Sequence, residues 1–177
     1  LWNVYHERYG VERKHLSEIA RLNFENAKNN PNAQTRRWDF AQNSFGDDDE
    51  ANPVIEGHIR RQDCSQITDG SATLILANES YARAYAQKRN ITLEAIPKIQ
   101  GFGHRTATML FSEKIKLSQD ANLTFPHVAE CIQDSFNRAG IQNVFELSGI
   151  ETHDCFSITQ YMAIDHFGIT KPGESWR

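Results

Sequence analysis

The segment that most constrains the fold is a strand-corner-helix pattern over residues 144–167, which read VFELSGIETHDCFSITQYMAIDHF. Val144, Phe145, Leu147 and Ile150 in residues 144–150 are apolar and partly β-branched, which predicts a buried strand. Residues 157–167 repeat apolar side chains at helical spacing, which predicts a helix that ends before Gly168. Ligands of parallel sheets bind outside the carboxyl ends of the strands, where the helices begin. We therefore expect chemistry at the corner between the two.

Four residues form this corner: His153, Asp154, Cys155 and Phe156. An imidazole and a thiol at the start of a helix are a candidate reaction centre, since both groups transfer protons near neutral pH. Asp154 or Ser157 is expected to cap the helix. A free cysteine is also often only a small apolar side chain, so the tetrad alone is compatible with plain packing.

Apolar periodicity, together with flanking Gly, Pro and Asn, predicts five further elements. Three are helices, over residues 12–29, 79–88 and 125–139, and two are strands, over residues 72–77 and 97–102. The turn Asp69-Gly70 precedes the first of these strands. The acidic run at residues 47–50 is expected to be a solvated loop.

Length and charge exclude several classes of protein. A chain of 177 residues forms one domain or two small ones, and its net charge of -4 argues against a general nucleic-acid binder. No apolar run is long enough to cross a bilayer. The cysteines at positions 64, 131 and 155 are widely spaced, which predicts reduced thiols and neither a disulfide framework nor a metal site. Cys131 is expected in the core, on the apolar face of its helix.

The tetrad His153 to Phe156 follows an apolar run that ends in Glu151, and it resembles the HDCF motif of sterol-carrier-type thiolases. Ordinary thiolases carry Asn-Glu-Ala-Phe at this place. A second match lies upstream. Ser65, Asp69-Gly70 and the apolar run that follows resemble the stretch where a thiolase chain returns from its loop domain into its first core sheet. The similarity covers about residues 12–174.

The resemblance implies an α/β, thiolase-like fold with mixed five-stranded sheets layered with helices, of which only part is present. Residues 1–67 would be the later part of the loop domain. Residues 68–96 would return a strand and a helix to the N-terminal half and add a linker. Residues 97–177 would begin the C-terminal half.

The same resemblance implies a thiolase, an acyl-CoA C-acyltransferase of lipid metabolism. It would catalyse reversible Claisen condensation or thiolytic cleavage of 3-ketoacyl-CoA. His153 matches the residue that donates a hydrogen bond to the enolate oxygen, and Cys155 matches the acid–base residue of HDCF thiolases. Ser65 matches the serine that touches the pantetheine arm of coenzyme A, and Phe156 is expected to pack over that arm or the acyl group.

Acyl-CoA and coenzyme A are then the expected partners, as substrates, with no cofactor, metal, nucleic acid or membrane span. The full-length protein is expected to be a homodimer or tetramer in the cytoplasm, or in the peroxisome of a eukaryote. The acyl-accepting cysteine and the Gly-His-Pro histidine of thiolases have no match here. We therefore expect an internal fragment that is inactive alone.

Two alternatives stay open. One is a non-catalytic thiolase-like scaffold subunit that binds acyl-CoA or a partner enzyme. The other is a Cys-His hydrolase that uses Cys155 and His153, which is disfavoured because residues two apart at a helix start rarely point at each other.

Overall fold

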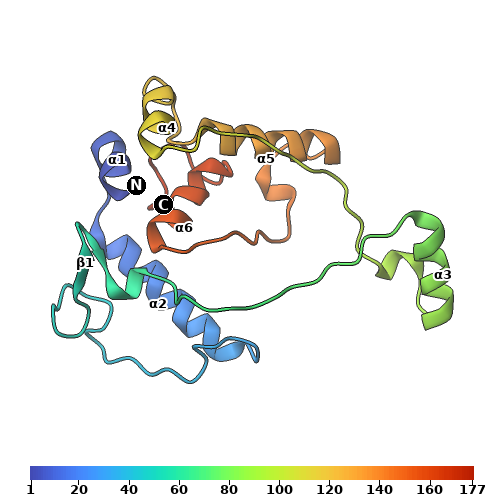
Figure 1. Cartoon of the computed structure of the whole chain (residues 1–177), viewed down its shortest axis with the longest axis horizontal. Helices are drawn as coiled ribbons and strands as arrows, with labels where there is room; N and C mark the ends of the chain where they lie inside the picture. The colour runs from blue at the N-terminus through green and yellow to red at the C-terminus, as the bar shows by residue number, and fades with distance from the viewer.

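The computed structural model describes residues 1–177 and contains six α-helices and a two-stranded antiparallel sheet (Figure 1). The helices are α1 (Trp2–Tyr9), α2 (Arg13–Asn29), α3 (Glu79–Arg89), α4 (Phe111–Leu117), α5 (Pro126–Ala139) and α6 (Ser157–His166). The strands are β1 (Val54–Glu56) and β2 (Ile59–Arg60), and short 3-10 turns lie at η1 (Arg61–Asp63), η2 (Leu93–Ala95) and η3 (Val144–Glu146). The four predicted helices are confirmed as α2, α3, α5 and α6, whereas α1, α4 and the hairpin were not predicted.

The core lies where α2 packs on α6, with α1 closing one end. Each helix places apolar residues on one face at a spacing of three or four, which is why the faces meet. The buried cluster consists of Trp2, Tyr5, Val11, Leu16, Ile19, Ile158, Tyr161 and Met162. None of the helices is both long and apolar enough to cross a membrane.

A buried polar network centred on Asp165 supports this core. The Tyr5 hydroxyl and the Gly173 amide both donate to Asp165 Oδ2, the latter over 2.9 Å. His166 Nε2 accepts a hydrogen bond from the Phe125 amide, so its Nδ1 carries the proton and donates to Asp165 Oδ1 over 2.6 Å. Burial, together with the bond to Asp165, raises the pKa of Tyr5 far above its ordinary value and keeps the hydroxyl a donor. The network joins α1, α6, the start of α5 and the C-terminal turn.

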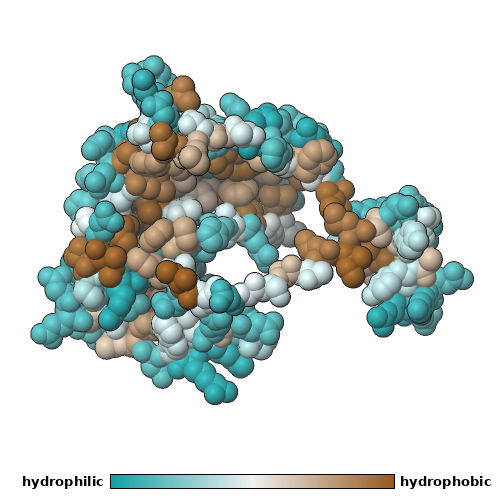
Figure 2. Space-filling view, in the orientation of Figure 1, coloured by the Kyte–Doolittle hydropathy of each residue, from teal (hydrophilic) through white to brown (hydrophobic).

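Helix α3 stands apart from the other helices, at the end of two long extended segments (Figure 1). These segments contain both predicted strands, 72–77 and 97–102, yet residues 66–77 and 97–109 make no backbone–backbone hydrogen bond. Apolar surface gathers where they approach α3 (Figure 2). Leu74, Ile75 and Leu76 are 88%, 91% and 75% exposed. The predicted strands and the five-stranded sheet are therefore not formed, because a strand needs neighbouring strands to pair its N–H and C=O groups.

The strand predicted over residues 144–150 is also wrong. Its first residues form η3, because Asn143 and Glu146 make a capping box. The Asn143 side chain accepts from the Phe145 amide over 3.0 Å, and Glu146 accepts from the Asn143 amide over 3.1 Å. Such local side-chain bonds offer the backbone an alternative to a sheet ladder.

The segment around Gly101 and Gly103 packs tightly on α5. A Cβ at Gly101 would collide with the carbonyl of Ser135, and a Cβ at Gly103 with that of Cys131. Arg138 of α5 completes the contact, since its guanidinium donates to the Phe102 carbonyl and lies 4.4 Å from the Phe102 ring centre. The two glycines thus allow close packing of the segment. Cys131, expected in the core, is only half-buried beneath this segment.

We expect Gly103→Ala to destabilise the protein by about 1–3 kcal/mol, because the new methyl group overpacks a contact with helix backbone. Urea unfolding followed by circular dichroism measures the change. Gly149→Ala is the matched control, since a Cβ there meets only open space. Equal stability of the two variants would contradict the tight contact.

Candidate active site

The corner residues 153–156 form no helix or strand and lead directly into α6. The cap residue is Phe156, and no side chain caps the helix, so the predicted caps Asp154 and Ser157 are both wrong. Each of those side chains bonds elsewhere. Asp154 accepts from Asn23 of α2 over 3.0 Å, and the Ser157 hydroxyl donates to Asp63 over 2.7 Å. The corner is therefore held by tertiary contacts with α2 and η1.

The residues after η1 pair with this corner. Cys64 and Phe156 form an isolated antiparallel bridge, and the Ser65 amide donates to the Cys155 carbonyl over 2.9 Å. In this pairing Ser65 lies directly opposite Cys155, and Cys64 lies opposite Phe156. The structure thus brings Ser65 to the corner.

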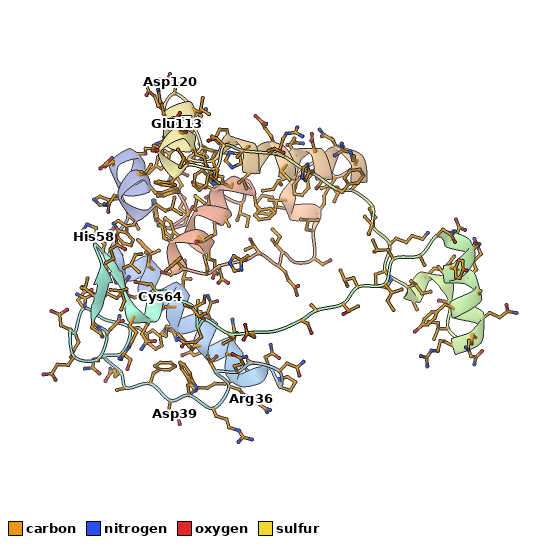
Figure 3. All side chains as sticks on the ribbon, in the orientation of Figure 1. Arg36, Asp39, His58, Cys64, Glu113 and Asp120 are labelled. Atoms are coloured by element: carbon orange, nitrogen blue, oxygen red, sulfur yellow. The ribbon has the colours of Figure 1, made fainter.

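The corner side chains differ in exposure. Cys155 is half-buried, whereas His153, Phe156 and Ser65 are exposed. All three cysteines are free thiols, and Cys64 lies at the end of η1 beside α2 (Figure 3). Burial, with the negative charge of Asp63 adding to it, raises the pKa of the Cys64 thiol. Because Cys64 also donates to the Arg60 carbonyl over 3.5 Å, it is held as a neutral thiol.

An open groove of about 510 Å³ lies next to the corner. Its side chains are mostly uncharged hydrogen-bonding groups, among them the amides of Asn23, Asn26, Asn30, Gln34, Gln62 and Gln66. Ser65 and Asp154 also line it, whereas His153, Cys155 and Phe156 do not. The groove therefore reaches the corner from the side of Ser65. Amides and hydroxyls of this kind suit a neutral, polar, chain-like ligand.

Sequence reasoning missed the buried acid beneath this corner, Asp63. Its carboxylate accepts from the Arg13 guanidinium, the Arg60 amide and the Ser157 hydroxyl. Arg13 and Ser157 are 50 and 94 residues away in sequence. No local spacing signals such partners, so only the folded chain reveals the site.

The acidic run at residues 47–50 is bound to arginine. Asp47 and Asp49 lie 3.4 Å and 2.8 Å from the Arg60 guanidinium. No three His, Cys, Asp or Glu side chains are grouped to hold a metal ion. Arg36 and Arg37, which follow the groove residue Thr35, are exposed, and Figure 3 shows Arg36 beyond the end of α2.

Comparison with known proteins confirms the thiolase resemblance. No family model matches the chain. It is 26% identical over 170 residues to the acetyl-CoA acetyltransferase of Methanothermobacter thermautotrophicus, which covers 96% of this chain and 39% of that protein. It is 24% identical over 171 residues to the acetyl-CoA acetyltransferase of Methanocaldococcus jannaschii, covering 97% of this chain and 40% of that protein. It is 24% identical over 168 residues to human sterol carrier protein 2, covering 95% of this chain and 28% of that protein.

Two of these relatives are named acetyl-CoA acetyltransferase, and the similarity supports a thiolase-like α/β fold. The chain spans 28–40% of the length of the curated relatives quoted above. The similarity covers almost the whole chain, so it includes both Ser65 and the HDCF corner.

Proposed function

We propose that the chain is part of an acyl-CoA C-acyltransferase that condenses acyl-CoA with acetyl-CoA or cleaves 3-ketoacyl-CoA. The observation that carries the proposal is the backbone hydrogen bond between Ser65 and Cys155 beside an amide-lined groove. It joins the two segments that separately match one site of sterol-carrier-type thiolases. Residues 1–67, 68–96 and 97–177 are then the loop-domain part, the return to the N-terminal half, and the start of the C-terminal half.

In this proposal Cys155 and His153 carry the Claisen step. The Cys155 thiolate removes a proton from the α-carbon of the acetyl thioester, and the resulting enolate oxygen accepts a hydrogen bond from the His153 N–H. The enolate carbon then attacks the carbonyl of an acyl group bound to a cysteine that lies outside these 177 residues. The bond from that carbonyl to sulfur breaks, and the cysteine leaves as a thiolate. Cleavage follows the same steps in reverse.

The groove is proposed to hold the pantetheine arm of coenzyme A. The two amide groups and the hydroxyl of the pantetheine arm match the amide-rich lining of the groove. Ser65 is proposed to touch the arm where the groove meets the corner. Phe156, 42% exposed, offers a ring for the arm or the acyl group to pack against. The exposed pair Arg36-Arg37 can receive the phosphates, because guanidinium binds phosphate oxygens in bidentate fashion. No cofactor or metal takes part.

The alternative is a non-catalytic scaffold that binds acyl-CoA or a partner enzyme. The exposed apolar residues Leu74 to Leu76 favour it, since bare apolar surface commonly marks contact with another chain. The enzyme requires coenzyme A binding and turnover by the complete protein. The scaffold requires binding of acyl-CoA or of a partner enzyme, without turnover.

The groove can be tested with the chain itself by titration calorimetry with coenzyme A. Asn26→Leu should weaken binding by about three- to tenfold, because a typical net hydrogen bond contributes about 1 kcal/mol. Asn29→Leu on the same helix is the matched control, since Asn29 does not line the groove. Equal affinities of the two variants would argue against the groove as the binding site.

Turnover is tested by cleavage of acetoacetyl-CoA in the presence of coenzyme A. We expect cleavage by the complete protein and none by the 177 residues alone, since no residue here matches the acyl-accepting cysteine. Cleavage by the 177-residue chain would contradict that expectation. Coenzyme A binding without cleavage by the complete protein would favour the scaffold.

A further inference from the structure

The carboxylate of Asp63 is fully buried and yet fully partnered. The residue is 2% exposed, and a buried charge is costly unless it is paired and hydrogen-bonded. Its three donors come from three places: Arg13 at the start of α2, the Arg60 amide before η1, and the Ser157 hydroxyl at the start of α6. Asp63 thus fixes α6 to η1 and α2 at one point.

That point is the inner end of a short series of contacts that leads to the corner. Asp63 bonds Ser157, the next residue Cys64 bridges Phe156, and the next, Ser65, donates to the Cys155 carbonyl. The three contacts run antiparallel from the buried end at Asp63 to the more exposed end at Cys155. The bond to Ser157 is the one that anchors this register, because the other two contacts lie nearer to solvent.

The start of α6 has no side-chain cap, and the residues before it make no regular structure. The contacts with residues 63–65 and the bond from Asn23 to Asp154 therefore restrain the corner. We propose that Asp63 is a positioning residue, which acts through Ser157 to hold Cys155 opposite Ser65 at the end of the groove. Its role in catalysis rests on the proposed function, whereas its control of the geometry of Cys155 stands without it.

Ser157→Ala tests the proposal on the 177-residue chain. The variant removes the bond from Asp63 to the corner and leaves Asp63 paired with Arg13 and Arg60, so the buried charge stays satisfied. Two rates are measured by peptide mass spectrometry: alkylation of Cys155 by iodoacetamide and deuterium exchange of the Ser65 amide. Both should rise about tenfold, which corresponds to 1.4 kcal/mol of lost restraint.

Cys131 in the same molecule is the internal control for alkylation, and Thr159→Ala is the matched variant. Thr159 lies in the first turn of α6 and its side chain makes no bond to Asp63. Neither Cys131 in Ser157→Ala nor Cys155 in Thr159→Ala should change its rate. Unchanged rates at Cys155 and Ser65 in Ser157→Ala, or an equal rise at Cys131, would overturn the proposal.

The complete protein then separates positioning from general stability. Ser157→Ala should lower kcat for condensation about tenfold, because Cys155 is displaced. Ser157 also lines the groove, so KM for acyl-CoA should rise, but by less than kcat falls. A rise in KM with unchanged kcat would overturn the role of Asp63 in positioning Cys155. If the parent protein shows no thiolase activity, the proposed function fails, and the alkylation and exchange rates still decide the geometric claim.

Discussion

In the complete protein, Cys155→Ala is expected to lower the rate of condensation by about 10²–10⁴-fold, the usual cost of losing a positioned acid–base group. The first acyl transfer should survive, because it uses a cysteine outside these residues. Labelled acyl-CoA measures both steps, as covalent label on the protein and as released condensation product. The fold should suffer little, since Cys155 is half-buried and alanine removes only the sulfur atom.

His153→Ala is the companion variant, expected to slow the same step by roughly 10²–10³-fold through loss of the donor to the enolate oxygen. Cys131→Ala is the control, because Cys131 lies on α5 and does not line the groove. A Cys155→Ala enzyme that condenses at the parent rate would show that the thiol only fills space. Loss of covalent label in the same variant would instead assign Cys155 to acyl transfer.

Asp165→Ala is expected to destabilise the fold by about 3–5 kcal/mol, the cost of removing one partner from a buried charged network. The substitution removes the acceptor of the Tyr5 hydroxyl and the Gly173 amide, and it leaves the His166 Nδ1–H only the Met162 carbonyl. Single domains have about 5–15 kcal/mol of stability in total, so this loss can unfold the chain near body temperature. Urea unfolding followed by circular dichroism gives the free energy.

Asp120→Ala is the matched control for this measurement. Asp120 is exposed beyond the end of α4 (Figure 3), and exposed substitutions typically change stability by less than about 0.5 kcal/mol. If Asp165→Ala and Asp120→Ala unfold at the same urea concentration, the network is not what holds α1, α6 and the C-terminal turn together.

The sequence alone determined the helices that carry the core. The spacing of Leu16 and Ile19, and of Ile158, Tyr161 and Met162, predicts α2 and α6, because a helix that packs on a core carries an apolar stripe along one face. Pro126 and Gly140 mark the start and the end of α5 in the sequence as they do in the structure. The HDCF tetrad and Ser65 likewise indicate the thiolase resemblance from the sequence alone.

Strands and contacts were decided only by the tertiary structure. An apolar run such as residues 72–77 is a strand only where neighbours pair its backbone, and here none does. The caps predicted at Asp154 and Ser157 failed for a related reason, since both side chains find partners on distant segments. Asp63 has no sequence signature, because its structural role depends on its contacts with Arg13 and Ser157, which only folding brings beside it. Local periodicity is a property of the sequence, whereas pairing across the chain is a property of the fold.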